Sequence, residues 1–299
     1  MFKNAVIYKI QAAGKAADPL LSTLLDGAAF VPCAPTQPTS VGWVPPRNQD
    51  NGLLVEHIDG QVILKLMTET KIIPADAVER KLDEACRAVE TSTGRKPGKK
   101  HRKELKEEVI HGLLPTALTR RAAVTVWLDL ARGLVVVDTT SQTRADDAAS
   151  MLVRSIEGLA MGVFSTIESP QSWMTRMLRA TDTSVDFSVD RDCELRASDE
   201  SGAVVRYQNH DLFIGEIAEH IDAGKLPVRL ALCYVERVSF VLTETCALRK
   251  IHILDTAYID TRTKDDDFDA DVAIATGEIG RLIDELVLDL GGEVPIATP

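Results

Sequence analysis

Strand-forming runs joined by very short turns constrain the fold of this 299-residue chain more than any other feature. Two such runs, Leu53–Ile58 and Gln61–Met67, flank Asp59-Gly60, a pair that favours a two-residue hairpin turn. Further runs predict a meander in the second half, over Val228–Val235, Val238–Leu242 and Leu248–Leu254. Because turns this short connect antiparallel neighbours, we expect antiparallel sheets.

Helical patterns lie between these groups of strands. From Pro74 to Pro115, apolar residues recur at helical spacing in two stretches separated by Gly94–Gly98, which predicts a hairpin of two helices. A terminal helix is expected to begin at Thr276 and to end at Gly291. Helices between groups of antiparallel strands indicate an α+β fold rather than a doubly wound parallel sheet.

We therefore expect two α+β lobes with helices packed on antiparallel sheets. The first lobe spans 1–157 and includes the helical hairpin, 75–115, as a projecting arm. The second spans 158–299 and includes an acidic loop and the terminal helix.

Charge is distributed unevenly along the chain. There are 34 Lys and Arg against 45 Asp and Glu, a net charge of −11. Residues 255–299 hold twelve of the acidic residues and three of the basic ones, so the rest of the chain carries only −2. The acidity is local, and it does not exclude binding to nucleic acid.

The bend of the helical hairpin is the most basic place in the sequence. It carries seven cations, with only Glu104 among them: Arg95, Lys96, Lys99, Lys100, Arg102, Lys103 and Lys106. Arg120 and Arg121 add two charges near the base of the same arm. Unmatched cations suit the phosphate backbone, whatever its sequence. Aromatic residues are scarce here and no helix-turn-helix or zinc-finger pattern is present, so we expect non-specific nucleic-acid contact.

Motifs of catalysis and cofactor binding are absent, including the phosphate-binding glycine loops, the nucleophile elbow and the zinc-protease pattern. The five cysteines lack the spacing of a zinc or redox site, and the N-terminus lacks the apolar block of a signal peptide. No span of the chain reads as a transmembrane helix. We expect a cytoplasmic protein with free thiols and with no catalytic residue, metal or cofactor.

One acidic pattern leaves an alternative open. Asp265, Asp267, Asp269 and Asp271 alternate as in a calcium-binding loop, but Ala270 and Thr276 stand where that loop needs Gly and Glu. We interpret the segment as a solvated acidic loop before a strand. The alternatives are an Asp-dependent Mg²⁺ nuclease or phosphotransferase, and a protein-interaction module whose basic arm grips an acidic partner.

Short stretches along the whole chain, in order, resemble the RdgC family of recombination-associated proteins. They are Phe30–Cys33, Gly42–Pro46, Lys71–Pro74, Glu108–Pro115, the frame of Trp127, Asp129, Gly133-Leu134 and Val137-Asp138, then His220–Lys225, Phe268–Asp271, Thr276–Glu278 and Leu290–Glu293. Each is weak alone, and together they are specific.

The resemblance implies a toroidal homodimer whose positively lined hole encircles duplex DNA. It also implies a non-enzymatic, nucleoid-associated protein that binds double-stranded or single-stranded DNA and opposes RecA-driven strand exchange. Leu118 stands where the family has an aromatic residue and is expected at the dimer interface. In the second half, Arg206 and Lys225 are expected to contact DNA, although Tyr207–His210 replaces lysines of the family there.

Overall fold

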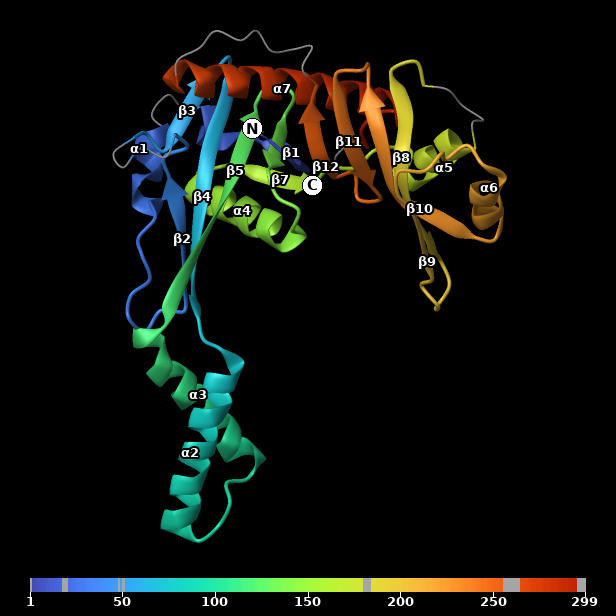
Figure 1. The fold of residues 1–299 in the computed structure, drawn as a ribbon. Helices are drawn as coiled ribbons and strands as arrows, with labels where there is room; N and C mark the ends of the chain where they lie inside the picture. Colours follow the sequence, from blue (N-terminus) through green and yellow to red (C-terminus); the bar gives the residue numbers. More distant parts are fainter. Residues whose placement is uncertain are drawn as a thin grey trace.

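The strands of the computed structural model form two antiparallel sheets with helices packed on them (Figure 1). The structure describes residues 2–17, 21–47, 49, 52–179, 184–254 and 264–294. Every strand pair within these ranges is antiparallel. The predicted α+β class with antiparallel sheets is therefore confirmed.

The first sheet has seven strands in the order β2-β4-β5-β6-β1-β7, with β3 also paired to β4. Its longest pair is β4–β5, whose register runs without a shift from Val62↔Leu128 to Ile72↔Leu118. Asp59 and Gly60 join β3 to β4 as predicted, and both have positive φ (48° and 76°), which a type I′ hairpin turn requires. The strands are β1 Val6–Ala12, β2 Thr39–Val44, β3 Val55–Ile58, β4 Gln61–Ile72, β5 Leu118–Asp129, β6 Leu134–Val137 and β7 Ala160–Val163.

The second sheet has five strands in the order β12-β11-β10-β8-β9. The predicted meander is confirmed as β10–β11–β12. Ala5 ties the two sheets together, because it exchanges backbone hydrogen bonds of 2.8 and 2.9 Å with Leu248 of β12. The strands are β8 Phe187–Ala197, β9 Val204–Tyr207, β10 Lys225–Tyr234, β11 Val238–Thr243 and β12 Leu248–Ile253.

Helices connect and cover the sheets. They are α1 Leu21–Leu25, α2 Ala75–Thr93, α3 Lys99–Leu113, α4 Gln142–Ser155, α5 Pro170–Leu178, α6 Gly215–Asp222 and α7 Lys264–Asp289, with short 3-10 turns at Gly14–Ala17, Asp26–Ala28 and Leu114–Thr116. In Figure 1, α2 and α3 lie beyond the ends of β4 and β5, away from both sheets. None of the described helices combines the length and the apolarity that crossing a bilayer would need.

Helix α7 runs along both sheets (Figure 1). Its 26 residues extend over about 39 Å at 1.5 Å per residue. Its buried residues Ile279 and Leu286 share one hydrophobic core with Trp127 of the first sheet and Phe240 of the second. A second core lies on the other face of the first sheet, where Leu152 of α4 packs. The shared core makes α7 the element that holds the sheets together.

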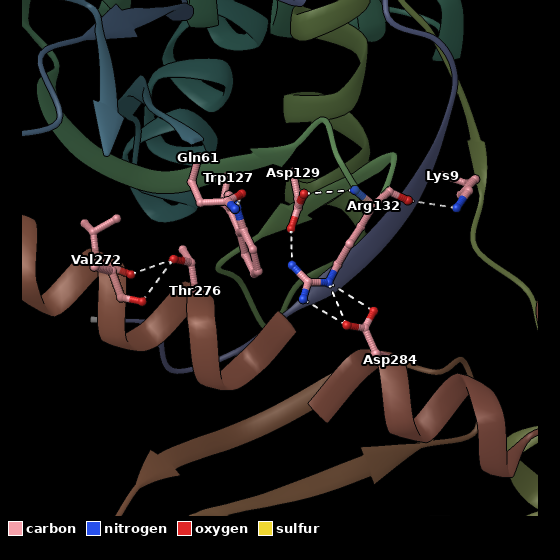
Figure 2. A network of polar contacts seen from close by, with 9 residues as sticks. Lys9, Gln61, Trp127, Asp129, Arg132, Val272, Thr276 and Asp284 are labelled. Carbon is pink, nitrogen blue, oxygen red and sulfur yellow. Dashed lines mark hydrogen bonds and ion pairs between the residues drawn. The ribbon is translucent and has the colours of Figure 1, made fainter. Parts of the chain in front are cut away.

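A polar network fastens α7 to the β5–β6 turn (Figure 2). Asp129 is fully buried and accepts hydrogen bonds from the backbone N–H (3.0 Å) and Nη1 (2.8 Å) of Arg132. The same guanidinium lies 2.8 Å from Asp284 of α7, and its hydrogen bonds to that carboxylate raise the pKa of Arg132. Gly280 makes room for this contact, since an added Cβ would lie 2.9 Å from the guanidinium.

The sequence interpretation of the C-terminal segment is wrong. The terminal helix begins at Lys264 rather than at Thr276, so Asp265–Asp271 belongs to its first turns and not to a loop before a strand. Acidic residues suit that position because the N-terminal end of a helix dipole is positive. In strand β2, Trp43 is buried and Gly42 allows a close approach to the backbone of Phe30.

Candidate nucleic-acid interface

The α2–α3 hairpin forms where the sequence predicts two helices. Gly94 ends α2 in the left-handed region (φ 71°), and its N–H donates to the Glu90 carbonyl at 2.8 Å. Val78 and Leu82 are the buried residues of α2. At the base of the hairpin, Lys71 donates to the carbonyl of Leu114 at 2.7 Å. This hydrogen bond fixes the base of the hairpin to the end of β4 in the first sheet, and the bend between the helices lies at the opposite end of the hairpin.

The seven cations of the bend, here called the basic cluster, are all exposed: Arg95, Lys96, Lys99, Lys100, Arg102, Lys103 and Lys106. Among the described residues, only two of them lie within 4.0 Å of an acidic group, Arg102 at 3.5 Å from Asp83 and Lys103 at 3.9 Å from Glu107. Exposed pairs of this kind contribute little to stability. The cluster keeps most of its positive charge open to a ligand.

The helix dipole of α3 adds to this positive potential. The first turn of α3 contains no acidic residue and includes Lys99, Lys100 and Arg102. Cations near a helix N-terminus are unfavourable by about 0.3–1 kcal/mol each at low salt. A bound anion would relieve this repulsion, so the local electrostatics favour a negatively charged partner.

Arg120 and Arg121 do not belong to one surface, because neighbouring residues of a strand point to opposite faces. Arg120 lines a cavity of about 220 Å³ with Arg144 and Asp147 of α4. Arg121 lies 2.8 Å from the carboxylate of Glu69, and its guanidinium is 5.4 Å from the centre of the Phe30 ring. Arg121 is thus engaged within the first sheet.

Leu118 is the first residue of β5, at the base of the hairpin. It is 80% exposed, and its cross-strand partner Ile72 is 47% exposed. Two exposed apolar residues side by side form a small patch suited to contact with protein. That Leu118 lies at a dimer interface stays a prediction.

The two cations predicted in the second half both lie on strands of the second sheet, Arg206 on β9 and Lys225 at the start of β10. Arg206 lies 2.9 Å from the carboxylate of Glu194, and Lys225 lies 3.1 Å from Nδ1 of His220. The structure also brings Arg196 and Arg229 within 3.7 Å of Glu194, at 3.6 and 3.7 Å. Sequence reasoning missed these two arginines. Arg229 meets Glu194 only through the cross-strand pairing of β10 with β8. Arg196 lies two residues after Glu194 on β8 and therefore on the same face, a spacing that strand alternation could have shown.

The acidic segment at the start of α7 is in part paired rather than solvated. Asp269 forms an ion pair with Arg47, which also lies 3.1 Å from Glu56. The ring of Phe268 is 4.8 Å from the same guanidinium. The side chains of Asp265 and Asp267 lie outside the described residues. Within the described part of the chain, no three His, Cys, Asp or Glu side chains lie together in a way that could hold a metal ion.

Comparison with known proteins gives matches over nearly the whole chain. A family model with the description "Putative exonuclease, RdgC" matches residues 1–293. The recombination-associated protein RdgC of Herminiimonas arsenicoxydans is 38% identical over 296 residues, and that of Janthinobacterium sp. (strain Marseille) is 37% identical over 297. The protein of the same name from Bordetella pertussis is 36% identical over 296 residues. Each of these alignments covers 98% of both chains.

Proposed function

The chain belongs to the RdgC family, and from this premise we propose that it acts in recombination by binding DNA without sequence preference. The relatives compared above are named recombination-associated proteins, and recombination takes place on DNA. The observation that carries the proposal is the basic cluster of the α2–α3 hairpin, which is exposed and largely unmatched by acid. Phosphates of DNA supply negative charge at any sequence, and their neutralisation releases counterions.

We propose further that two copies of the chain close into a ring around duplex DNA and limit the access of a RecA-type recombinase. A closed two-fold ring buries the same patch of each copy, and the exposed pair Leu118 and Ile72 suits such a contact. The net charge of −11 favours this arrangement, because acid on the outer rim repels DNA while cations at the hole attract it. In the cell, the protein would then be associated with the nucleoid.

A salt titration tests the proposed DNA contact. Changing Lys99, Lys100, Arg102 and Lys103 together to Ala should weaken binding to two unrelated duplexes about equally. Each lost phosphate contact lowers the slope of log K against log[salt] by about 0.9, so four contacts lower it by about 3.6. Binding is measured by fluorescence anisotropy on labelled duplexes at several salt concentrations.

The matched control removes four cations outside the hairpin: Lys3→Ala, Lys15→Ala, Arg154→Ala and Arg179→Ala. These residues are exposed and lie outside the basic cluster. The control should keep the wild-type slope, and thermal melts should show that both quadruple variants fold. Equal slopes for the wild type and the cluster variant would remove the hairpin from the DNA interface.

The description of the family model favours one second candidate, an exonuclease. An exonuclease of this kind would need a Mg²⁺ site, and the acidic residues at the start of α7 are the candidates for its ligands. Incubating end-labelled linear DNA with the purified protein, with Mg²⁺ or with EDTA, separates the two functions. Mg²⁺-dependent shortening that Asp269→Asn and Asp271→Asn abolish would establish the exonuclease, and intact DNA under both conditions favours the binding protein.

A further inference from the structure

A pocket of about 430 Å³ lies on the second sheet, at its junction with the first. Its strand residues alternate with core residues: Glu194 and Arg196 line the pocket, whereas Leu195 between them has a buried side chain in the shared core. Asn4 and Thr140, from the side of the first sheet, also line it. The pocket therefore depends on the way the two sheets meet, and it is separate from the α2–α3 hairpin.

Cations outnumber acids in this pocket. Its lining includes five cationic side chains, Arg196, Arg206, Arg229, Arg249 and Lys250, and three acidic ones, Asp192, Glu194 and Glu244. Four of the cations are arginines, whose planar guanidinium groups match the oxygens of a phosphate in pairs. We refer to this site as the arginine pocket.

Glu194 lies at the centre of the arginines. It is 6% exposed, and Arg206, Arg196 and Arg229 lie within 4 Å of its carboxylate, at 2.9, 3.6 and 3.7 Å. One carboxylate balances one of these charges. It also restricts three long side chains to one region, which reduces the entropy that each would lose on binding a ligand.

The two other acids of the pocket, Glu244 and Asp192, do not balance the remaining positive charge. Glu244 lies 3.5 Å from Arg196, and Asp192 lies 3.9 Å from Lys250. Arg249 donates a hydrogen bond to the carbonyl of Thr139, and among the described residues no acidic group lies within 4.0 Å of it. Burial, followed by the positive charge of Arg229, lowers the pKa of Arg249. Arg249 is thus held near a second cation in a partly buried place, and Glu194 is the acid that the neighbouring Arg229 shares with Arg206 and Arg196.

We infer that the arginine pocket binds a phosphate group through Arg206, Arg229 and Arg249, with Glu194 as the residue that positions the first two. A volume of about 430 Å³ falls in the range of small-molecule sites, and it leaves room for the sugar next to the phosphate. The phosphate belongs either to a DNA strand or to a free nucleotide. This site adds to the hairpin contact and does not depend on it.

Isothermal titration of the full-length protein with inorganic phosphate and with deoxythymidine monophosphate, at constant ionic strength, tests the pocket. Arg206→Gln with Arg229→Gln should weaken both affinities about ten-fold or more, since two charged hydrogen-bond donors are lost. Glu194→Gln should strengthen both affinities, because the amide oxygen of Gln can still accept from the arginines and hold them in place while the charge that competes with the ligand is removed. Gln at 206 and 229 can still donate to Glu194, and thermal melts check that the variants fold.

The matched control is Arg154→Gln with Arg179→Gln, two exposed arginines on other elements, and it should leave phosphate affinity unchanged. No measurable phosphate binding by the wild type, or equal affinity in the wild type and both folded pocket variants, overturns the inference.

Duplex DNA distinguishes the two sources of phosphate. If the double arginine variant loses affinity for both phosphate and duplex DNA, the pocket holds a phosphate of the strand. If it loses affinity for phosphate and the nucleotide alone, the pocket holds a free nucleotide. The hairpin variant with four Ala should keep its phosphate affinity, so failure of the proposed hairpin contact is recognised independently of failure of the pocket.

Discussion

Glu69 shows how a single buried charge organises its surroundings. It is 2% exposed in β4, and its carboxylate accepts from the backbone N–H of Cys33 at 2.6 Å and from Nε of Arg121 at 2.8 Å. These two hydrogen bonds, that of Cys33 first, lower the pKa of Glu69 to about 2. The same contacts tie the loop before β2 to β4 and β5, close to the base of the hairpin.

The pKa of Glu69 predicts a dependence of stability on pH. Its folded pKa lies below the ordinary value of 4.5, so ionised Glu69 stabilises the fold above pH 4.5, and this contribution is lost as the pH falls toward 2. Thermal melts of wild type and Glu69→Gln between pH 7 and pH 2 should show a lower melting temperature for the variant at neutral pH. The difference should shrink between pH 4.5 and 2, and a difference that stays constant over that range would contradict the assignment.

At the scale of elements, the contact between α7 and the β5–β6 turn depends on the pair Arg132 and Asp129. Arg132→Met removes the cation and leaves the fully buried Asp129 without its charged partner, which should cost about 3–5 kcal/mol of unfolding free energy. Adding Asp129→Asn to Arg132→Met removes the unpaired charge and should recover much of the loss. Urea denaturation of the wild type, the two single variants and the double variant gives the coupling energy. Additive losses would mean that the two residues act independently.

The whole molecule has its two sheets under one long helix and its hairpin standing apart from both (Figure 1). A ring wide enough for DNA requires more than one chain of 32.6 kDa, so we predict a stable dimer in solution. Sedimentation at micromolar concentration measures this directly. If only the monomer is found, the encircling mechanism fails, although DNA binding by the basic cluster would still stand.

Encirclement has a second expected outcome at this scale. A closed ring should be retained on circular DNA through a high-salt wash and should be lost from a linear duplex of the same sequence, because salt removes electrostatic contacts and leaves topological ones. Equal loss from both DNAs would indicate surface binding without encirclement.

The sequence by itself determined the features that depend on neighbours along the chain. Asp59-Gly60 predicts its hairpin and Gly94 its helix end, because turn and cap geometry are properties of a few consecutive residues. The basic cluster is visible for the same reason, since its seven cations fall within twelve residues. Only the tertiary structure decided which residues meet across strands. The pairing of Glu194 with Arg229 and Arg206, the engagement of Arg121 by Glu69, and the ion pair of Asp269 with Arg47 join residues that local periodicity does not relate. The pattern of a strand predicts which residues lie on each face of the sheet. Which strands pair with one another depends on the packing of the whole chain.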